Sequence, residues 1–303
     1  MQKILVYLAN GTQGGAVARC AVAQGFQVRA LVRQESKSHA LAAMGMEIAC
    51  GDLISGEGLQ EAHKDVNFVV LQMPLGAPAD VETGMRHALA AILVSGVQGV
   101  VVKMPSASAT IPTTEPSLVT NARIEAMLRE AAIPYAMVRP TMYLDNLLRP
   151  DIRRGIAIDG RLRLPLAERQ RVAWTSVDDA AKASIAIVKS GALVGDYLVS
   201  GREALDGVEL AARFSKALER EVKYERVDLS VLEREVDERM GAGVGKKVSS
   251  KFRFFETHPD QAWWMLARAY GEDSGPRGFV PESLDAWIAR HVESFRAEGF
   301  QAA

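Results

Sequence analysis

The feature that most constrains the fold is the regular alternation of short β-rich runs with helix-like segments along the first 140 residues. Six apolar runs are predicted to be strands, namely residues 3–8, 27–32, 47–50, 67–71, 99–102 and 135–139. Segments of helical composition and period separate them, namely residues 16–24, 38–44, 58–63, 81–95 and 121–131. Repeated β–α–β units of this kind predict an α/β fold, a doubly wound parallel sheet with helices on both faces.

The pattern changes after Pro140. Residues 147–166 mix arginine, proline and glycine, which predicts loop and short strand, and residues 196–199 predict one more strand. Further helices are predicted at residues 176–189, 206–218 and 229–240, and near 259–270 and 281–297. The glycine-rich stretch 241–247 is typical of a mobile connection. The second half therefore predicts a smaller, mostly helical lobe, with Phe254, Phe255, Trp263 and Trp264 in its core and Trp174 also packed.

Charge and cysteine content argue against several classes of partner. The chain has 36 basic and 37 acidic residues, a net charge of −1, and no basic tract, so no nucleic-acid partner is expected. Cys20 and Cys50 form no pair or cluster, and the five histidines lack ligand spacing, so no metal site is expected. The sequence shows neither a signal-peptide pattern nor eighteen consecutive apolar residues, which predicts a cytoplasmic protein without a membrane span.

The strongest local motif is the glycine-rich turn from Leu8 to Gly15, between the first strand and the first helix. Gly11 and Gly14 have the spacing of the last two glycines of a GxxGxxG turn, and Leu8 stands in place of the first. A dinucleotide pyrophosphate needs backbone N–H groups without intervening side chains, at the N-terminus of a helix. The residues predicted to bind it are Asn10, Gly11, Thr12, Gln13 and Gly14. The alternative is a tight turn that recruits glycine for structural reasons only.

Basic residues follow the second predicted strand. Arg33 stands at its end and Lys37 four residues later, where an acid would bind free ribose hydroxyls and a base suits a 2′-phosphate. These two side chains therefore predict NADP(H), with NADPH preferred over NADH; otherwise they are two solvated surface charges. The ends of the next two strands are expected beside the adenine, ribose and nicotinamide, through Asp52, Leu53, Gln72, Met73 and Pro74.

Taken together, these residues resemble the NmrA-like family of atypical short-chain dehydrogenase/reductases over nearly the whole chain. The matching stretches are residues 10–15, 28–33, 51–53, 133–147, 177–181 and 197–201. The resemblance implies an NADP(H)-binding Rossmann domain over residues 1–146, to which residues 175–200 return. It also implies a lobe for substrate or partner over residues 147–174 and 201–303, and Pro140 near the cofactor.

The family divides into NADPH-dependent reductases and regulators that bind the nucleotide without turnover. None of the six tyrosines begins a YxxxK motif, and Asn121 stands where many relatives place a lysine. Asn121 can still hydrogen-bond a ribose or a substrate carbonyl, but it supplies no proton. By resemblance Ser106 and Tyr143 are expected near the nicotinamide, although a turn serine and a core aromatic are equally good interpretations. Lys103, at the end of the fifth strand, is a possible replacement for the missing lysine.

These observations lead to two hypotheses from different classes. The first is an NADPH-dependent reductase that transfers hydride to a small unsaturated or carbonyl acceptor, such as a quinone or enone, with Asn121, Ser106 and Tyr143 as candidate catalytic residues. The nicotinamide carries the chemistry in such reactions, and an electrophilic acceptor needs no strong acid. The second is a non-catalytic NADP(H) sensor that acts through a protein partner. The sequence leaves open an oligomer in either case.

Overall fold

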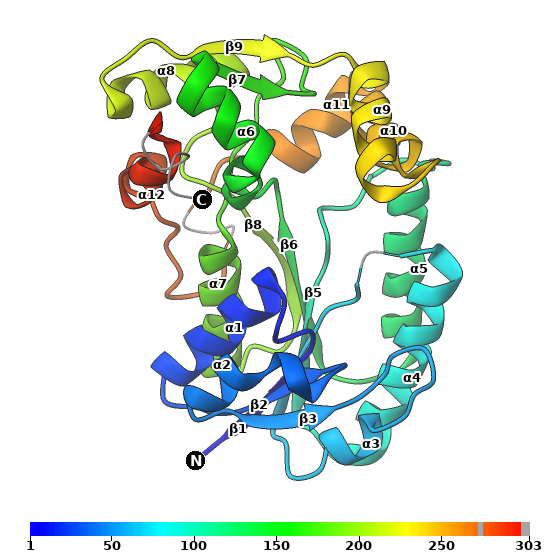
Figure 1. The fold of residues 1–303 in the computed structure, drawn as a ribbon. Helices are drawn as coiled ribbons and strands as arrows, with labels where there is room; N and C mark the ends of the chain where they lie inside the picture. The colour runs from blue at the N-terminus through cyan, green and yellow to red at the C-terminus, as the bar shows by residue number, and fades with distance from the viewer. Residues whose placement is uncertain (75, 272–274, 298–303) are drawn as a thin grey trace.

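A parallel seven-stranded sheet forms the centre of the structure, a computed structural model that describes residues 1–74, 76–271 and 275–297 (Figure 1). The strands are β1 (Lys3–Val6), β2 (Gln27–Val32), β3 (Glu47–Cys50), β4 (Phe68–Leu71), β5 (Gly99–Lys103), β6 (Tyr135–Pro140) and β8 (Gly195–Val199). Their order is β3-β2-β1-β4-β5-β6-β8, and each neighbouring pair is parallel. The chain thus reverses its direction of winding between β1 and β4. The predicted doubly wound fold is confirmed.

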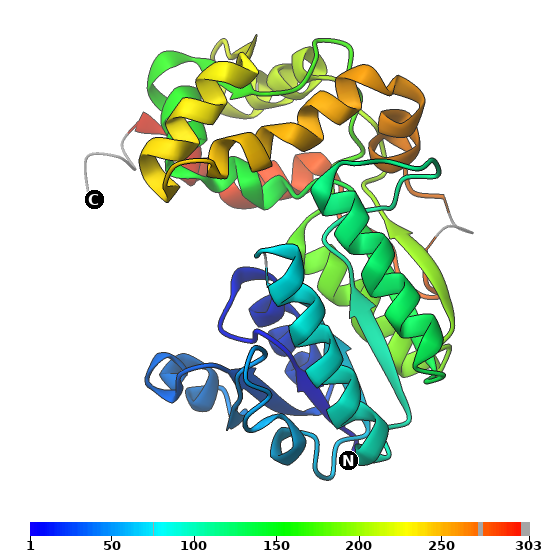
Figure 2. The same cartoon turned by 90° about the vertical axis from the view of Figure 1, so that its right-hand side faces the viewer.

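Helices cover both faces of this sheet, because the strands carry apolar side chains on each face. On β1, Ile4 and Val6 point into one core, together with α1 (Thr12–Ala23) and α7 (Val177–Ser190). Leu5 points into the other core, which contains α3 (Leu59–Ala62), α4 (Pro78–Ser95) and α5 (Pro116–Glu130). Short helix α2 (His39–Ala43) leads into β3. Figure 2 shows α4 and α5 together over one side of the sheet.

The second region lies beyond the carboxyl ends of the strands (Figures 1 and 2). Its elements are α6 (Pro150–Arg154), β7 (Arg161–Leu164), α8 (Gly207–Leu218), β9 (Lys223–Arg226), α9 (Leu229–Met240), α10 (Val244–Thr257), α11 (Pro259–Ala262) and α12 (Leu284–His291). β7 and β9 form a separate parallel pair. The lobe has its own apolar core, which includes the buried side chains of Trp174, Phe214 and Trp287. The mostly helical lobe is therefore confirmed, with a small sheet added.

The chain returns to the main sheet between two parts of this lobe. α7 packs beside α1, and β8 pairs with β6 along its whole length. Arg139 ties the return together: its guanidinium donates to Asp196 on β8 (2.5 Å) and to Glu125 on α5 (2.8 Å). Because Arg139 is buried, these two carboxylates are what make its charge tolerable inside the protein.

Two expectations about the lobe are wrong. The stretch 241–247 is not wholly a connection, because α10 begins at Val244 and Gly245 is buried against the backbone of α9. A Cβ at position 245 would lie 2.1 Å from the carbonyl oxygen of Glu233, so glycine here permits close helix packing. The second half of the stretch 241–247 is therefore rich in glycine because α10 packs tightly against α9 there.

The second correction concerns the paired tryptophans. Phe254 and Phe255 are buried as predicted, but Trp263 is 57% exposed and Trp264 is 38% exposed. After α11 the chain continues as a π-helix over Trp263–Ala267, and the residues of that turn that face the core are Met265, Leu266 and Ala267. A π-helical turn holds more residues than an α-helical turn, so it changes which side chains of Trp263–Ala267 face the core. The two indoles lie on the exposed side.

Candidate functional site

The glycine-rich turn lies at the carboxyl end of β1, beside the point where the strand order reverses. Leu8 adopts a left-handed backbone conformation, with a φ of 52°, in the place where the motif normally has its first glycine. The N–H of Gly11 donates to the carbonyl of Leu8 (2.9 Å), which closes the turn. Gly11 is the N-cap of α1 and gives it no side-chain hydrogen bond, and both Gly11 and Thr12 are exposed. The start of α1 is therefore open to an anion.

Gly14 is also a packing position. A Cβ at this position would lie 2.3 Å from the carbonyl oxygen of Leu8 and 2.6 Å from Nε2 of Gln72. The Gln72 side chain is itself buried, and its Nε2 donates to the carbonyl of Tyr7 (3.1 Å). The space in front of Gly14 is thus filled by the turn. Glycine is required there so that α1 can pack against the end of the turn that follows β1.

A pocket of about 470 Å³ extends from this turn along the ends of β2, β3 and β4. Leu8 lines it, together with seven of the predicted cofactor residues: Asn10, Arg33, Lys37, Asp52, Leu53, Met73 and Pro74. The Asp52 carboxylate accepts hydrogen bonds from the N–H groups of Ser55 (3.0 Å) and Ile54 (2.7 Å). These bonds, together with the Arg33 charge, hold the pKa of Asp52 below its usual range. The lining of the pocket thus includes two exposed cations, Arg33 and Lys37, and two acids, Asp52 and Asp80.

A second polar group lies where β1, β5 and β6 end. Lys103, the last residue of β5, is only 4% exposed. Its Nζ donates to Oε1 of Gln13, at the start of α1, and to the hydroxyl of Tyr143 (3.3 Å), three residues after β6. Burial lowers the pKa of Lys103 to about 7, and burial raises the pKa of Tyr143, to which Asp145 adds. Gln13, Lys103 and Tyr143 are called the lysine cluster below.

Ser106 and Asn121 form a third feature. Both side chains are buried, and Nδ2 of Asn121 on α5 donates to Oγ of Ser106 (3.3 Å) in the loop after β5. The Ser106 hydroxyl donates in turn to the carbonyl of Ala107 (3.0 Å). The structure therefore joins two of the three predicted catalytic residues, while Tyr143 contacts Lys103 instead.

Pro140 is buried at the end of β6 and directs the chain into this region. It pairs with Val199, and the next residue, Thr141, donates its hydroxyl to the carbonyl of Ala173 (2.5 Å). Tyr143 then forms a bridge with Thr175. Pro140 thus places Tyr143 by anchoring the start of the segment that carries it.

Lys103 is not among the predicted site residues, although it is a possible replacement for the missing lysine. The signal was a lysine as the last residue of an otherwise apolar strand, since such a side chain emerges at the edge where parallel sheets bind ligands. Its two contacts are 90 and 40 residues away in the chain, so no local pattern could reveal them.

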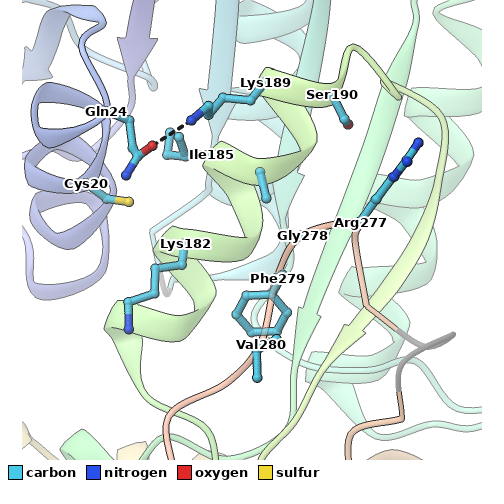
Figure 3. Close-up of a pocket in the computed structure, with 11 residues that line it drawn as sticks. Cys20, Gln24, Lys182, Ile185, Lys189, Ser190, Arg277, Gly278, Phe279 and Val280 are labelled. Atoms are coloured by element: carbon cyan, nitrogen blue, oxygen red, sulfur yellow. Dashed lines mark hydrogen bonds between the residues drawn. The ribbon is translucent and has the colours of Figure 1, made fainter.

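A further pocket of about 550 Å³ lies between α1, α7 and residues 277–280 (Figure 3). Cys20 in the second half of α1 and Gln24 directly after that helix line it, and Nζ of Lys189 on α7 donates to Oε1 of Gln24 (2.7 Å). The glycine-rich turn lies at the other end of α1, so this pocket belongs to a different part of the surface.

No group of three or more histidine, cysteine, aspartate or glutamate side chains in residues 1–74, 76–271 and 275–297 could hold a metal ion. Over the same ranges, no helix combines the length and the apolar character needed to cross a membrane.

The topology, the turn after β1 and the pocket at the strand ends define a Rossmann-type α/β protein. Within that class the chain belongs to the NmrA-like family, whose model matches residues 1–270. It is 32% identical over 232 residues to the NAD(P)H azoreductase of Xenophilus azovorans, covering 75% of this chain and 77% of that protein.

Solved structures of low sequence identity share the fold. A triphenylmethane reductase from Citrobacter sp. superposes with a TM-score of 0.80 at 17% identity, covering 97% of this chain and 100% of the other. An NADPH-dependent quinone oxidoreductase from Escherichia coli gives 0.72 at 19% identity, covering 95% and 99%. The architecture, including the lobe, is therefore common to both of these structures.

Proposed function

We propose that this protein is an NADPH-dependent reductase that transfers hydride to a small unsaturated or carbonyl acceptor of the quinone or enone type. The observation that carries the proposal is the pocket beside the open N-terminus of α1, with the exposed Arg33 and Lys37 among its lining residues. An anion-binding helix start and a pair of cations at the end of β2 suit a pyrophosphate and a 2′-phosphate respectively. Similarity to an NAD(P)H azoreductase supports reduction as the reaction class.

The residues present fit the cofactor, and each part of the nucleotide has its own group of side chains. The backbone of Asn10, Gly11, Thr12 and Gln13 would hold the pyrophosphate, and Gly14 and Gln72 keep this turn in shape. Arg33 and Lys37 would bind the 2′-phosphate, while Asp52, Leu53, Met73 and Pro74 would enclose the adenosine. When bound, the reduced nicotinamide supplies the hydride.

The acceptor would bind between the carboxyl ends of β5 and β6 and the second region. Ser106 and Asn121 would orient its polar atom by hydrogen bonds, and Tyr143 would border it. In this proposal residues 1–146 and 175–200 hold the nucleotide, and residues 147–174 and 201–303 close over the acceptor and exclude water. Orientation and water exclusion are the main contributions that a protein makes to hydride transfer.

The test is NADPH oxidation against a panel of quinones, enones, imines and azo compounds, with the affinities for NADPH and NADH measured in parallel by calorimetry. We expect tight NADPH binding, weaker NADH binding, and turnover of one acceptor class. Turnover with equal affinity for NADPH and NADH would show that Arg33 and Lys37 do not bind the 2′-phosphate. Absence of nucleotide binding would refute the proposal as a whole.

A second candidate is a redox sensor that binds NADP(H) and acts through a protein partner. It is favoured by Asn121, which stands where many relatives have a lysine, and by the absence of any YxxxK sequence. This candidate predicts nucleotide binding without turnover of any acceptor in the panel, and a partner whose affinity differs between the oxidised and reduced nucleotide.

A further inference from the structure

Among residues 1–74, 76–271 and 275–297, no carboxylate forms a hydrogen bond or ion pair with the buried Lys103. Its Nζ contacts an amide oxygen of Gln13 and the phenol oxygen of Tyr143, and both groups are uncharged. The ammonium also lies 5.6 Å from the centre of the Tyr143 ring. A lysine kept for stability alone is usually paired with an acid when it is buried, because an unpaired charge in the interior is costly. Lys103 therefore calls for another explanation.

The position of the lysine cluster suggests what that explanation is. Lys103 ends β5, Tyr143 follows β6, and Gln13 belongs to the first turn of α1, directly after the phosphate-binding turn. These three elements meet at the carboxyl edge of the sheet, beside the reversal between β1 and β4, where open α/β sheets bind their ligands. An acceptor positioned for reduction would therefore come close to Nζ of Lys103.

We propose that the ammonium group of Lys103 gives the acceptor the proton that accompanies the hydride, and that Tyr143 positions this ammonium through its hydroxyl oxygen. The proposal rests on the proposed reductase function. The hydride brings two electrons and one hydrogen to the acceptor, and the oxygen or nitrogen atom at its other end becomes negative. An N–H bond of Lys103 then breaks, a bond from that hydrogen to the acceptor atom forms, and the neutral amine regains a proton from water beside the partly exposed Gln13.

The surroundings of Lys103 suit a proton donor that works near neutral pH. Burial lowers the pKa of this lysine to about 7, which is where a general acid is most effective. The groups that face it do not compete for the proton. Burial raises the pKa of Tyr143, so its phenol stays neutral, and the amide of Gln13 does not titrate. Asp145 lies behind Tyr143, and its carboxylate accepts the N–H of Val177 (2.8 Å).

The first experiment compares Lys103→Met with the parent and with Lys223→Met, an exposed lysine on β9 as the matched control. General acids contribute about 100-fold or more to turnover, so we expect Lys103→Met to lower kcat by at least that factor. We expect the NADPH affinity of both variants to differ from that of the parent by less than about threefold, and the control to keep the parent kcat. A variant that loses NADPH affinity but keeps its kcat would make Lys103 a cofactor ligand and overturn the proposal.

The second experiment uses the pH profile of kcat. In the parent, kcat should fall as the pH rises through the pKa of Lys103, because only the protonated lysine donates. Tyr143→Phe removes an acceptor that favours the charged lysine, so this limb should move to lower pH. A purely structural Tyr143 would lower kcat without moving the limb, and that result would overturn its positioning role.

A third measurement does not depend on turnover. In protein without nucleotide, labelled with ¹³C at the lysine ε carbons, one NMR signal should titrate near pH 7, vanish in Lys103→Met and shift to lower pH in Tyr143→Phe. A Lys103 signal that titrates with the exposed lysines would overturn the proposal. If the parent binds NADPH, reduces nothing and still shows this titration, the proposed function fails. If the parent reduces an acceptor and Lys103→Met does so equally well, the proton donor lies elsewhere and the reductase assignment stands.

Discussion

The carbonyl oxygen of Leu8 lies 2.3 Å from the point that a Cβ at position 14 would occupy, so α1 and the end of β1 touch through Gly14. Gly14→Ala should therefore destabilise the protein by about 1–3 kcal/mol, the usual cost of overpacking, although the better helix propensity of alanine offsets about 1 kcal/mol. Urea denaturation measures this change. Nucleotide affinity should fall as a consequence of the displaced turn.

Gly11→Ala is the matched control for this prediction. Gly11 is exposed, has an ordinary φ of −86°, and its Cβ would lie 3.2 Å from the same oxygen. We expect it to cost less than about 1 kcal/mol of stability and to weaken nucleotide binding directly, because the new methyl group stands beside the open N–H groups of α1. Equal losses of stability in the two variants would show that Gly14 is not a packing position.

Arg33→Ala should weaken NADPH binding selectively. A charge-assisted hydrogen bond contributes about 1.5–3 kcal/mol, so its loss should raise the Kd for NADPH by about 10- to 100-fold. The Kd for NADH, which lacks the 2′-phosphate, should stay the same and serves as the internal control. Calorimetric titration with both nucleotides measures the two values. The same loss for NADH would mean that Arg33 holds another part of the pocket.

Asn121 and Ser106 should behave as one unit. Each of Asn121→Ala and Ser106→Ala removes the same buried hydrogen bond, so the double variant should lose less turnover and stability than the sum of the single changes. The coupling should be about 0.5–3 kcal/mol, as for other residues in contact. The shape of the pH–rate profile should not change, because neither side chain titrates near neutral pH.

Thr120→Ala provides the control for this cycle. Thr120 precedes Asn121 on α5, and its hydroxyl donates to the carbonyl of Pro116 within the helix (2.9 Å). It should turn over acceptors like the parent. Strict additivity of Asn121→Ala and Ser106→Ala would disprove the coupling, and parent-like turnover of Asn121→Ala would place Asn121 outside the site.

The parts of the fold that were predictable are those where local pattern and tertiary environment agree. β2 and β3 have their predicted bounds, since each is a short β-rich run with turn residues on either side. β9 was missed because three of the four residues of Lys223–Arg226 are charged, and these three suit a helix equally well. The bounds of α10 depend on the contact of Gly245 with α9, which no sequence period encodes.

The candidate site divides in the same way. The cofactor pocket follows from strand ends, because a parallel sheet brings all its carboxyl ends to one edge. The lysine cluster could not be predicted in this way, since the direction of a long side chain at that edge depends on the neighbouring side chains. Lys103 reaches past the end of β4 to Gln13 because Gln72, which follows β4, turns inward to Tyr7.

Lys103 should also leave a signature in the stability of the protein. Its pKa is about 7 in the folded state against the ordinary 10.5, so between these values the unfolded chain binds a proton that the folded chain lacks. The free energy of unfolding of the parent should therefore rise with pH in this window, by up to about 1.4 kcal/mol per pH unit from this residue. Below pH 7 both states are protonated and the contribution is constant.

Lys103→Met isolates this contribution, because other groups titrate alike in both proteins. Urea denaturation at several pH values from 6 to about 9.5 should show the stability of the parent gaining on that of the variant above pH 7. The difference between the parent and Lys223→Met should stay flat over the same range, since the Lys223 side chain is 56% exposed. A flat difference for Lys103→Met as well would mean that Lys103 is solvated in the folded protein, and that its lowered pKa and its role as a proton donor near neutral pH are both wrong.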